Sequence, residues 1–294
     1  MWNRKEKGMK HIFRIVFLSV TTIMAVLAFT AATYAWFSSN KSVSTDTVTA
    51  RTGEKTLELL LSSSESGGFS SMGECPITQV NDQDKKVLMP VSTADLTEFV
   101  YAPFTDGGMA ASFERVENEK YIYHGRIYLM AQGKGHDESS RLNLYLDQSD
   151  GLLGQDVDGE LLNASRLGLA FDDEKSSRVI LRLSEKENAG DGQVFNTVVG
   201  GTTLGKNEVL QYQGGGVSAV ADPSVPVEDF TVSFENNGMK LPEKPLLQME
   251  LNRVYKLDIY FYLEGCDPDC SSSVELDEAD LYLAFYGVLD REEG

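Results

Sequence analysis

The stretch KLDIYFYL, from Lys256 to Leu263, carries the clearest structural pattern in this chain of 294 residues. Apolar residues occupy every second position, and the positions between them hold a lysine, an aspartate and two tyrosines. A period of two sends alternate side chains to opposite faces, which is typical of a β-strand. Because Tyr260 and Tyr262 make the second face partly apolar as well, we expect a central strand with both faces covered.

Similar alternation recurs along the chain and predicts an all-β fold. Asp-Gly and Asn-Gly pairs, which suit tight hairpins, begin at positions 106, 150, 158, 191 and 237. Beyond the N-terminus we expect helix only as a turn or two at 92–96 and 274–280. The other expected strands are 56–61, 142–146, 178–183, 230–235 and 281–286, and, with less regular alternation, 86–91, 121–130, 167–171 and 208–212.

The connections between these strands have irregular lengths. Such lengths favour a β-sandwich of jelly-roll or Greek-key type over an up-and-down barrel, and we expect the sandwich to span residues 57–294. The glycine-rich region 190–216 is either a loop within one domain or a linker to a second subdomain that begins after residue 216. The expected strand at 208–212 favours the loop.

Residues 1–35 form a hydrophobic export segment. Five basic residues precede an uncharged run from Ile15 to Asn40, an order that inserts into a membrane with the N-terminus on the cytoplasmic side. As a signal peptide the segment would be cut before Trp36, because the small residues Thr33 and Ala35 occupy the positions that a signal peptidase reads. As a retained anchor it is long enough to span a bilayer, which takes about 20 residues. In either case the remaining chain is secreted or lies on the extracellular face of the membrane.

The residues around this cut resemble a known export signal. Thr33-Tyr34-Ala35-Trp36-Phe37 is similar to the signal of the TasA/camelysin family of secreted Gram-positive surface and matrix proteins. Thr47–Gly53 followed by Thr56–Leu59 also resembles the entry into that family's first strand. The resemblance favours cleavage by a signal peptidase. It further implies a place in the cell envelope or biofilm matrix and assembly with other copies into fibres, in which residues 36–56 would be an extended arm pairing with a neighbouring subunit.

The charge of the chain excludes one class of partner. It holds 26 basic and 45 acidic residues, a net charge of −19. Such a surface repels phosphate groups, so we expect no nucleic-acid partner. Its simplest role is to keep an exported protein soluble.

Two of the three cysteines, Cys266 and Cys270, lie on either side of a turn around Pro268. In an oxidising compartment we expect them to form a disulfide that closes this turn. A thiol or metal site that also uses Asp267 and Asp269 is the alternative. Zinc sites need three or four ligands, however, and no histidine is spaced to complete one. The third cysteine would then stay unpaired.

An acidic cluster in the middle of the chain is the candidate calcium site, and calcium is the one cofactor that the sequence suggests. Calcium prefers several carboxylate oxygens on a turn. Gly154 stands where the helix–loop–helix calcium pattern requires an aspartate, so two exposed hairpin turns are the alternative explanation. The residues of the cluster are Asp147, Asp150, Asp156, Asp158 and Glu160.

No catalytic residue emerges from the sequence. Camelysin-like members of the resembled family are described as metalloproteases, but neither His124 nor His136 has the second histidine, four residues away, that a zinc-protease helix needs. We therefore expect an exported, non-enzymatic structural protein of the cell surface or extracellular matrix. The alternative is a membrane-tethered β-sandwich module that binds a glycan or a protein.

Overall fold

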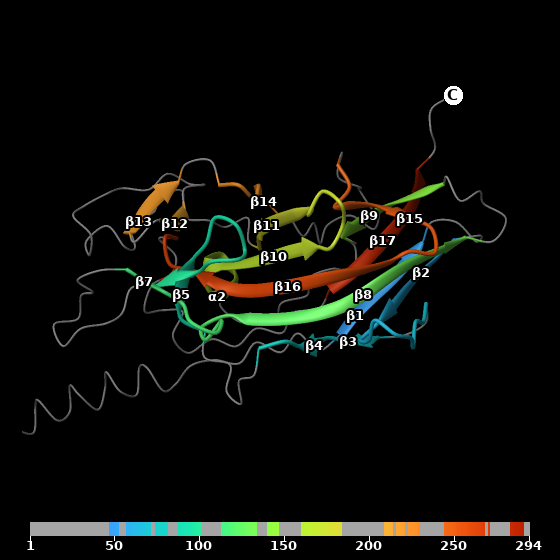
Figure 1. The fold of residues 1–294 in the computed structure, drawn as a ribbon, viewed down its shortest axis with the longest axis horizontal. Coiled ribbons are helices and arrows are strands. Elements are labelled where there is room, and N and C mark those ends of the chain that lie inside the picture. The colour runs from blue at the N-terminus through green and yellow to red at the C-terminus, as the bar shows by residue number, and fades with distance from the viewer. Residues whose placement is uncertain are drawn as a thin grey trace, which may run out of the picture. The chain divides into compact units, whose positions relative to one another are not determined.

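The computed structural model describes residues 47–52, 57–71, 74–81, 88–101, 113–133, 140–146, 160–183, 209–213, 216–220, 223–229, 244–267, 270 and 283–290. All of them belong to one compact unit, Lys41–Gly294. They form seventeen strands and one short helix, so this part of the chain is mostly β, as predicted (Figure 1). Within these ranges, no helix is long and apolar enough to cross a bilayer.

The larger of the two main sheets is organised around β16 (Val254–Glu264). On one side β16 pairs antiparallel with β10 (Ser165–Phe171), and the sheet continues through β11 (Arg178–Arg182) to β14 (Val227–Asp229). On the other side it pairs antiparallel with β8 (Tyr123–Gly133). Its last two residues pair parallel with β5 (Pro90–Ser92).

Four short or peripheral strands complete this ten-stranded sheet. Two of them, β2 (Leu57–Ser62) and β4 (Thr78–Gln79), pair with β8. The other two, β6 (Val100–Tyr101) and β7 (Glu114–Arg115), continue the sheet beyond β5. Because β11 pairs parallel with β14 and β16 pairs parallel with β5, the sheet is mixed.

The second sheet has five strands in the order β15 (Leu247–Glu250), β9 (Arg141–Leu146), β17 (Leu283–Asp290), β1 (Thr47–Thr52) and β3 (Cys75–Pro76). In it, β17 pairs antiparallel with β9 but parallel with β1. The remaining described elements are the hairpin of β12 (Val209–Gln213) and β13 (Gly216–Val220) and the helix α2 (Glu160–Ala164).

One hydrophobic core is shared by the two main sheets. Leu257 of β16 belongs to the same buried cluster as Leu144 of β9 and Phe285 of β17. The opposite face of β16 contributes Tyr260 and Tyr262 to a second cluster, together with residues of the segment 91–122. Both faces of β16 are therefore covered, as the sequence predicted.

The alternation located most of the long strands. The predicted ranges overlap β2, β5, β8, β9, β10, β11, β12, β16 and β17, whereas residues 230–235, 274–280 and the five Asp-Gly or Asn-Gly turns lie outside the described residues. The helical turn predicted at 92–96 is wrong, because Ser92 ends β5 and bends occupy 94–97. There Thr93 Oγ1 accepts a hydrogen bond from the backbone N–H of Leu96, and Asp95 Oδ1 accepts one from the backbone N–H of Thr97. These side-chain oxygens take the place of the main-chain carbonyls that would accept the same N–H groups in a helix.

The expected arm, residues 36–56, contains a strand that pairs within its own chain. β1 lies between β17 and β3, with five paired positions on β17 and two on β3. Residues 36–46 and 53–56 lie outside the described residues. The segment 47–52 is therefore a strand of the second sheet in this structure.

Gly168 of β10 sets how closely the 94–97 bend approaches the sheet. A Cβ at this position would overlap Cδ2 of Leu96, which itself has a φ of 58°. We expect Gly168→Ala to lower the free energy of unfolding in urea by about 1–3 kcal/mol, the usual cost of overpacking. In a Leu96→Ala background the overlapping atoms are gone, so the same substitution should cost much less. Equal costs in the two backgrounds would contradict this contact.

Candidate functional site

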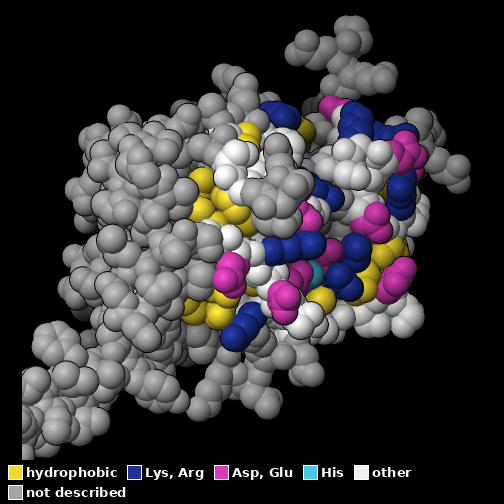
Figure 2. Space-filling view, turned by 60° about the vertical axis from the view of Figure 1, so that its left-hand side comes forward, with side chains coloured by type: hydrophobic (Ala, Val, Ile, Leu, Met, Phe, Trp, Pro, Cys, Tyr) yellow, Lys and Arg dark blue, Asp and Glu magenta, His cyan; other side chains and the backbone are white. Residues whose placement is uncertain are grey.

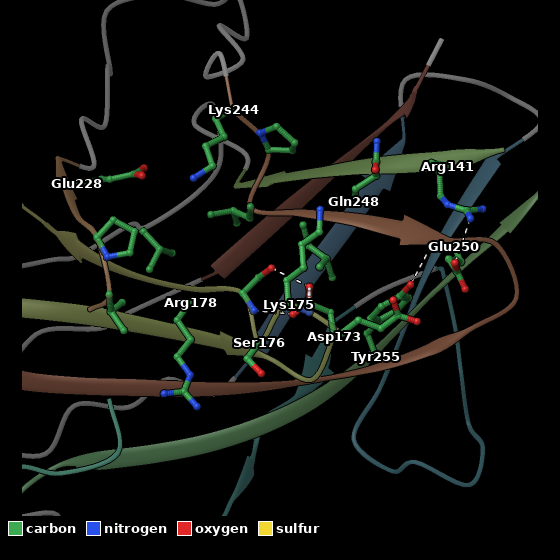
Figure 3. A pocket seen from close by; sticks show the side chains of 18 of the residues that line it. Arg141, Asp173, Lys175, Ser176, Arg178, Glu228, Lys244, Gln248, Glu250 and Tyr255 are labelled. Carbon is green, nitrogen blue, oxygen red and sulfur yellow. Dashed lines mark hydrogen bonds and ion pairs between the residues drawn. The ribbon is translucent and has the colours of Figure 1, made fainter. Parts of the chain in front are cut away.

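A pocket of about 860 Å³ opens beside the edge strands of the two main sheets. Its walls are the turn between β10 and β11, the segment leading into β14, and residues 244–250 with Arg141 of β9 (Figure 3). Its volume falls within the range of small-molecule sites, about 300–1,000 Å³. Among the described strands β14 and β15 are the outermost of their sheets, so both edges border the pocket.

The turn from residue 172 to 177 forms one wall, and Asp173 fixes its shape. Asp173 Oδ1 accepts the backbone N–H of Ser177 at 2.5 Å, and Oδ2 accepts that of Lys175 at 3.3 Å. Ser176 has a φ of 50°, in the left-handed region that a tight reversal uses. The backbone that carries Lys175 is therefore held in place, and its side chain extends toward the pocket (Figure 3).

An ion-pair network occupies another part of the lining. Glu250 lies 3.0 Å from Arg141 Nη2 through Oε1, and 3.5 Å from Arg253 Nη1 through Oε2. Arg253 Nη1 also lies 3.7 Å from Glu174 Oε1, and its guanidinium lies over the ring of Tyr255. In this part of the lining the two arginines and the two glutamates neutralise one another.

Three more cations line the pocket without an ion-pair partner in the described part of the chain. They are Lys175, Lys244 and Arg178, of which Arg178 donates a hydrogen bond to the backbone carbonyl of Asp95 at 2.8 Å. Among the described residues of the lining, five side chains are basic and four are acidic, a balance of +1 in a chain whose net charge is −19. The pocket is therefore a locally basic site on an acidic protein.

The segment around Cys266, which the sequence singled out, ends β16 in a buried polar cluster. Arg166 Nη2 donates to Asp267 Oδ2 at 2.5 Å, and both side chains are almost wholly buried. Beside them, Glu264 Oε1 accepts the backbone N–H of Cys266 at 3.1 Å. Burial raises the pKa of Glu264 to about 7, although the charge of Arg166 opposes this shift. Burial also raises the pKa of the Cys266 thiol well above its usual value.

The disulfide predicted between Cys266 and Cys270 is not formed in this structure. Both residues, like Cys75, are present as thiols, and Cys266 packs in a buried cluster with Val100 and Leu210. Backbone hydrogen bonds close the turn instead: Asp267 N donates to Glu264 O, and Cys270 N donates to Asp267 O, each at 3.0 Å. The turn therefore has its shape without a covalent link.

His124 of β8 has partners that its sequence neighbourhood did not suggest. Its Nδ1 lies 2.6 Å from Glu119 Oε2, and its Nε2 lies 3.3 Å from Asp258 Oδ1, although this second contact is not aligned as a hydrogen bond. Arg126 Nε donates to the same Asp258 oxygen at 2.6 Å, and Tyr260 stacks on the imidazole. Charged side chains of both signs gather around the histidine in Figure 2. The arrangement places the imidazole between two carboxylates.

The other predicted sites fall on residues that are not described. Within the described ranges, no group of three or more His, Cys, Asp or Glu residues is arranged to hold a metal ion. Of the five calcium candidates, Glu160 alone lies within the described residues, where it is the first residue of α2. The cleavage site at Thr33, Ala35 and Trp36 and the calcium candidates Asp147, Asp150, Asp156 and Asp158 lie outside the described residues and stay predictions.

A comparison of the chain with protein-family models, curated proteins and solved structures found no match. The geometry and the charge of the pocket are therefore the only guide to what it could bind. Sequence reasoning missed this pocket, because its residues come from separate segments between Arg141 and Tyr255 and share no spacing pattern.

Glu264 should make the stability of the protein depend on pH. Its folded-state pKa of about 7 lies above its usual value, so the folded state keeps a proton that the unfolded state loses. The free energy of unfolding should then fall as the pH rises from about 4.3 to 7, by an amount on the order of 3 kcal/mol. Glu264→Gln, which has the same shape without the charge, should remove that slope in urea denaturation at a series of pH values.

The matched control is Glu58→Gln, which makes the same chemical change at an exposed position of β2. We expect this variant to keep the slope of the native protein. A slope in Glu264→Gln equal to that of the native protein would contradict a raised pKa for this carboxyl group.

Proposed function

We propose that this chain is an exported, non-enzymatic structural protein of the cell surface or extracellular matrix, and that it assembles by exchanging strand β1 between copies. The observation that carries the proposal is the position of β1, the first described strand after the hydrophobic N-terminal segment, between two strands of a sheet. The resemblance of Thr33–Phe37 to the TasA/camelysin export signal supports export and implies fibre assembly.

The topology allows β1 to be exchanged at low cost. Its sheet partners are β17, near the C-terminus, and β3, so its removal leaves the two-residue strand β3 without its described partner but separates no other described pair of strands. Because β1 precedes the other described strands, it can leave the sheet without any other described element being threaded past it. A β1 from a second copy would make the same pairs in the same register, which is the basis of strand exchange between identical subunits.

For the fold we propose a β-sandwich related to the Greek-key type. The support is the core that the two main sheets share, because two packed sheets with interdigitated inner faces define a sandwich. The parallel pairs β1–β17, β5–β16 and β11–β14 distinguish it from a purely antiparallel jelly roll.

A membrane-tethered ligand-binding module is the second candidate function. The observation that favours it is the pocket of about 860 Å³ with its basic balance of charge. In this case the hydrophobic segment would be retained as an anchor. The two functions are compatible in one protein, since β1 is not among the residues that line the pocket.

The exchange of β1 can be tested with one engineered cysteine. Val48 of β1 lies directly opposite Cys75 of β3 in an antiparallel pair, a spacing that a disulfide can bridge. Oxidation of monomeric Val48→Cys protein should therefore give an intrachain bond, lock β1 in place and prevent assembly. Oxidation after assembly in reducing buffer should instead join the chains into a ladder on a non-reducing gel.

Thr49→Cys is the matched control, because position 49 is not opposite Cys75 in the register of β1 and β3. This variant should assemble under both conditions and give no ladder. Assembly of the oxidised, intrachain-bonded Val48→Cys protein at the native rate would contradict strand exchange. Failure of the native protein to assemble at any concentration would contradict the structural role itself.

A further inference from the structure

We propose that the pocket beside β14 and β15 binds a small anionic ligand that carries carboxylate or phosphate groups, held by Lys175 and Lys244, with Arg178 adding positive charge to the lining. This inference rests on the second candidate function, the ligand-binding module, and names the chemistry of its ligand. It does not depend on the exchange of β1.

The acidic side chains of the lining are mostly engaged already. The Asp173 carboxylate accepts hydrogen bonds from its own turn, including those from the backbone N–H groups of Lys175 and Ser177. Glu250 pairs with Arg141 and Arg253, and Glu174 pairs with Arg253 as well. Glu228 is thus the only described acid of the lining that neither makes an ion pair nor closes a turn.

The cations outside the ion-pair network outnumber the two acids outside it, Asp173 and Glu228. Lys175 and Lys244 are exposed, and neither makes an ion pair with a described residue. Arg178 uses one N–H to bind the carbonyl of Asp95, and a backbone carbonyl does not neutralise its charge. Outside the ion-pair network the described lining therefore has three positive charges and two negative ones, Asp173 and Glu228, and this excess of one positive charge favours an anion.

The position of the cations in a concave site increases the electric field that an anion would meet there. A concave site with low-dielectric walls focuses the field of the charges that line it. Here the apolar part of the lining includes Val179, Val225 and Leu247, all buried, and the prolines Pro226 and Pro245. The labelled lysines extend from opposite sides, Lys175 from the turn after β10 and Lys244 from the segment before β15 (Figure 3). An anion between them would gain charge-assisted hydrogen bonds from two elements at once.

The size and the polarity of the pocket further restrict the class of ligand that it could bind. A volume of about 860 Å³ accommodates a molecule of the size of a short oligosaccharide. Tyr255 is the one aromatic residue of the described lining, and it is buried beneath Arg253, so it offers no open ring for a neutral sugar to stack on. Charge rather than stacking is therefore the expected source of affinity. An acidic oligosaccharide and a sugar phosphate share the required anionic oxygen atoms.

Isothermal titration calorimetry of the full-length protein in neutral detergent tests this inference. Three probes distinguish the sources of the anionic group: trigalacturonic acid for carboxylate, glucose 1,6-bisphosphate for phosphate, and maltotriose as the neutral sugar. We expect at least one anionic probe to bind and maltotriose not to bind. We also expect affinity to fall as salt rises from 50 to 500 mM, because ions screen exposed charges.

The variants Lys175→Gln and Lys244→Gln should each weaken binding of the anion by about tenfold, the usual effect of losing one charge-assisted hydrogen bond. The control Lys120→Gln makes the same change at an exposed lysine outside the pocket and should leave the affinity unchanged. Binding of maltotriose as tight as that of the anions would overturn the anionic ligand while leaving a ligand-binding function in place. No binding by either anion, or equal weakening by all three variants, would overturn the proposed site.

Discussion

The burial of β16 on both faces is the constraint on which the rest of this structure depends. The inward face puts Leu257, Ile259 and Phe261 into the core shared by the two sheets, and none of the three is accessible to solvent. Each such side chain contributes roughly 1.5–3 kcal/mol when it is fully buried. Register follows from this burial, since a slip of one residue would exchange these side chains with Asp258, Tyr260 and Tyr262. The positions of β8 and β10, which pair along both sides of β16, are fixed with it.

On the outward face of β16, the charged side chain of Asp258 is buried beside His124 and Arg126, whose positive charges compensate for its burial. Burial alone would lower the pKa of His124 and raise that of Asp258, but their proximity to each other and to Glu119 and Arg126 reverses both directions. The pKa of His124 is therefore raised, and its contribution to stability is lost as the pH rises through that value. The pKa of Asp258 is lowered to about 2, and its contribution is lost only as the pH falls toward 2. Between about 4 and 6.5 both contributions are present.

The sequence predicted the parts of the fold that depend on local alternation. Strands such as β9, β11 and β16 have the period of two that a buried face imposes, so their positions follow from the pattern alone. The short strands β3, β4, β6 and β7 have two residues each and are too short to show a period. The parallel contact of β1 with β17 was not predicted either, because it joins segments more than 230 positions apart in the sequence.

The candidate site was less predictable than the fold, for the same physical reason. Lys175 precedes β11, which is the second strand from an edge of the larger sheet, and Lys244 precedes β15, which is an edge strand of the second sheet. The two lysines line one pocket only because the fold brings these two edges together. Likewise, the partners of His124 include Asp258, which lies on the adjacent strand and 134 positions away in the sequence. A sequence motif is recognised by a fixed spacing of residues along the chain. Neither the pocket residues nor the partners of His124 have such a spacing.

The proposed assembly requires β1 to be held more weakly in the monomer than β16, which pairs along both of its sides. Hydrogen–deuterium exchange measured by mass spectrometry, on monomer and on assembled protein, tests this difference most directly. Our account predicts that residues 254–264 are protected in both states, and that residues 47–52 exchange quickly in the monomer and become protected after assembly. Equal protection of residues 47–52 and 254–264 in the monomer, with no change on assembly, would contradict it.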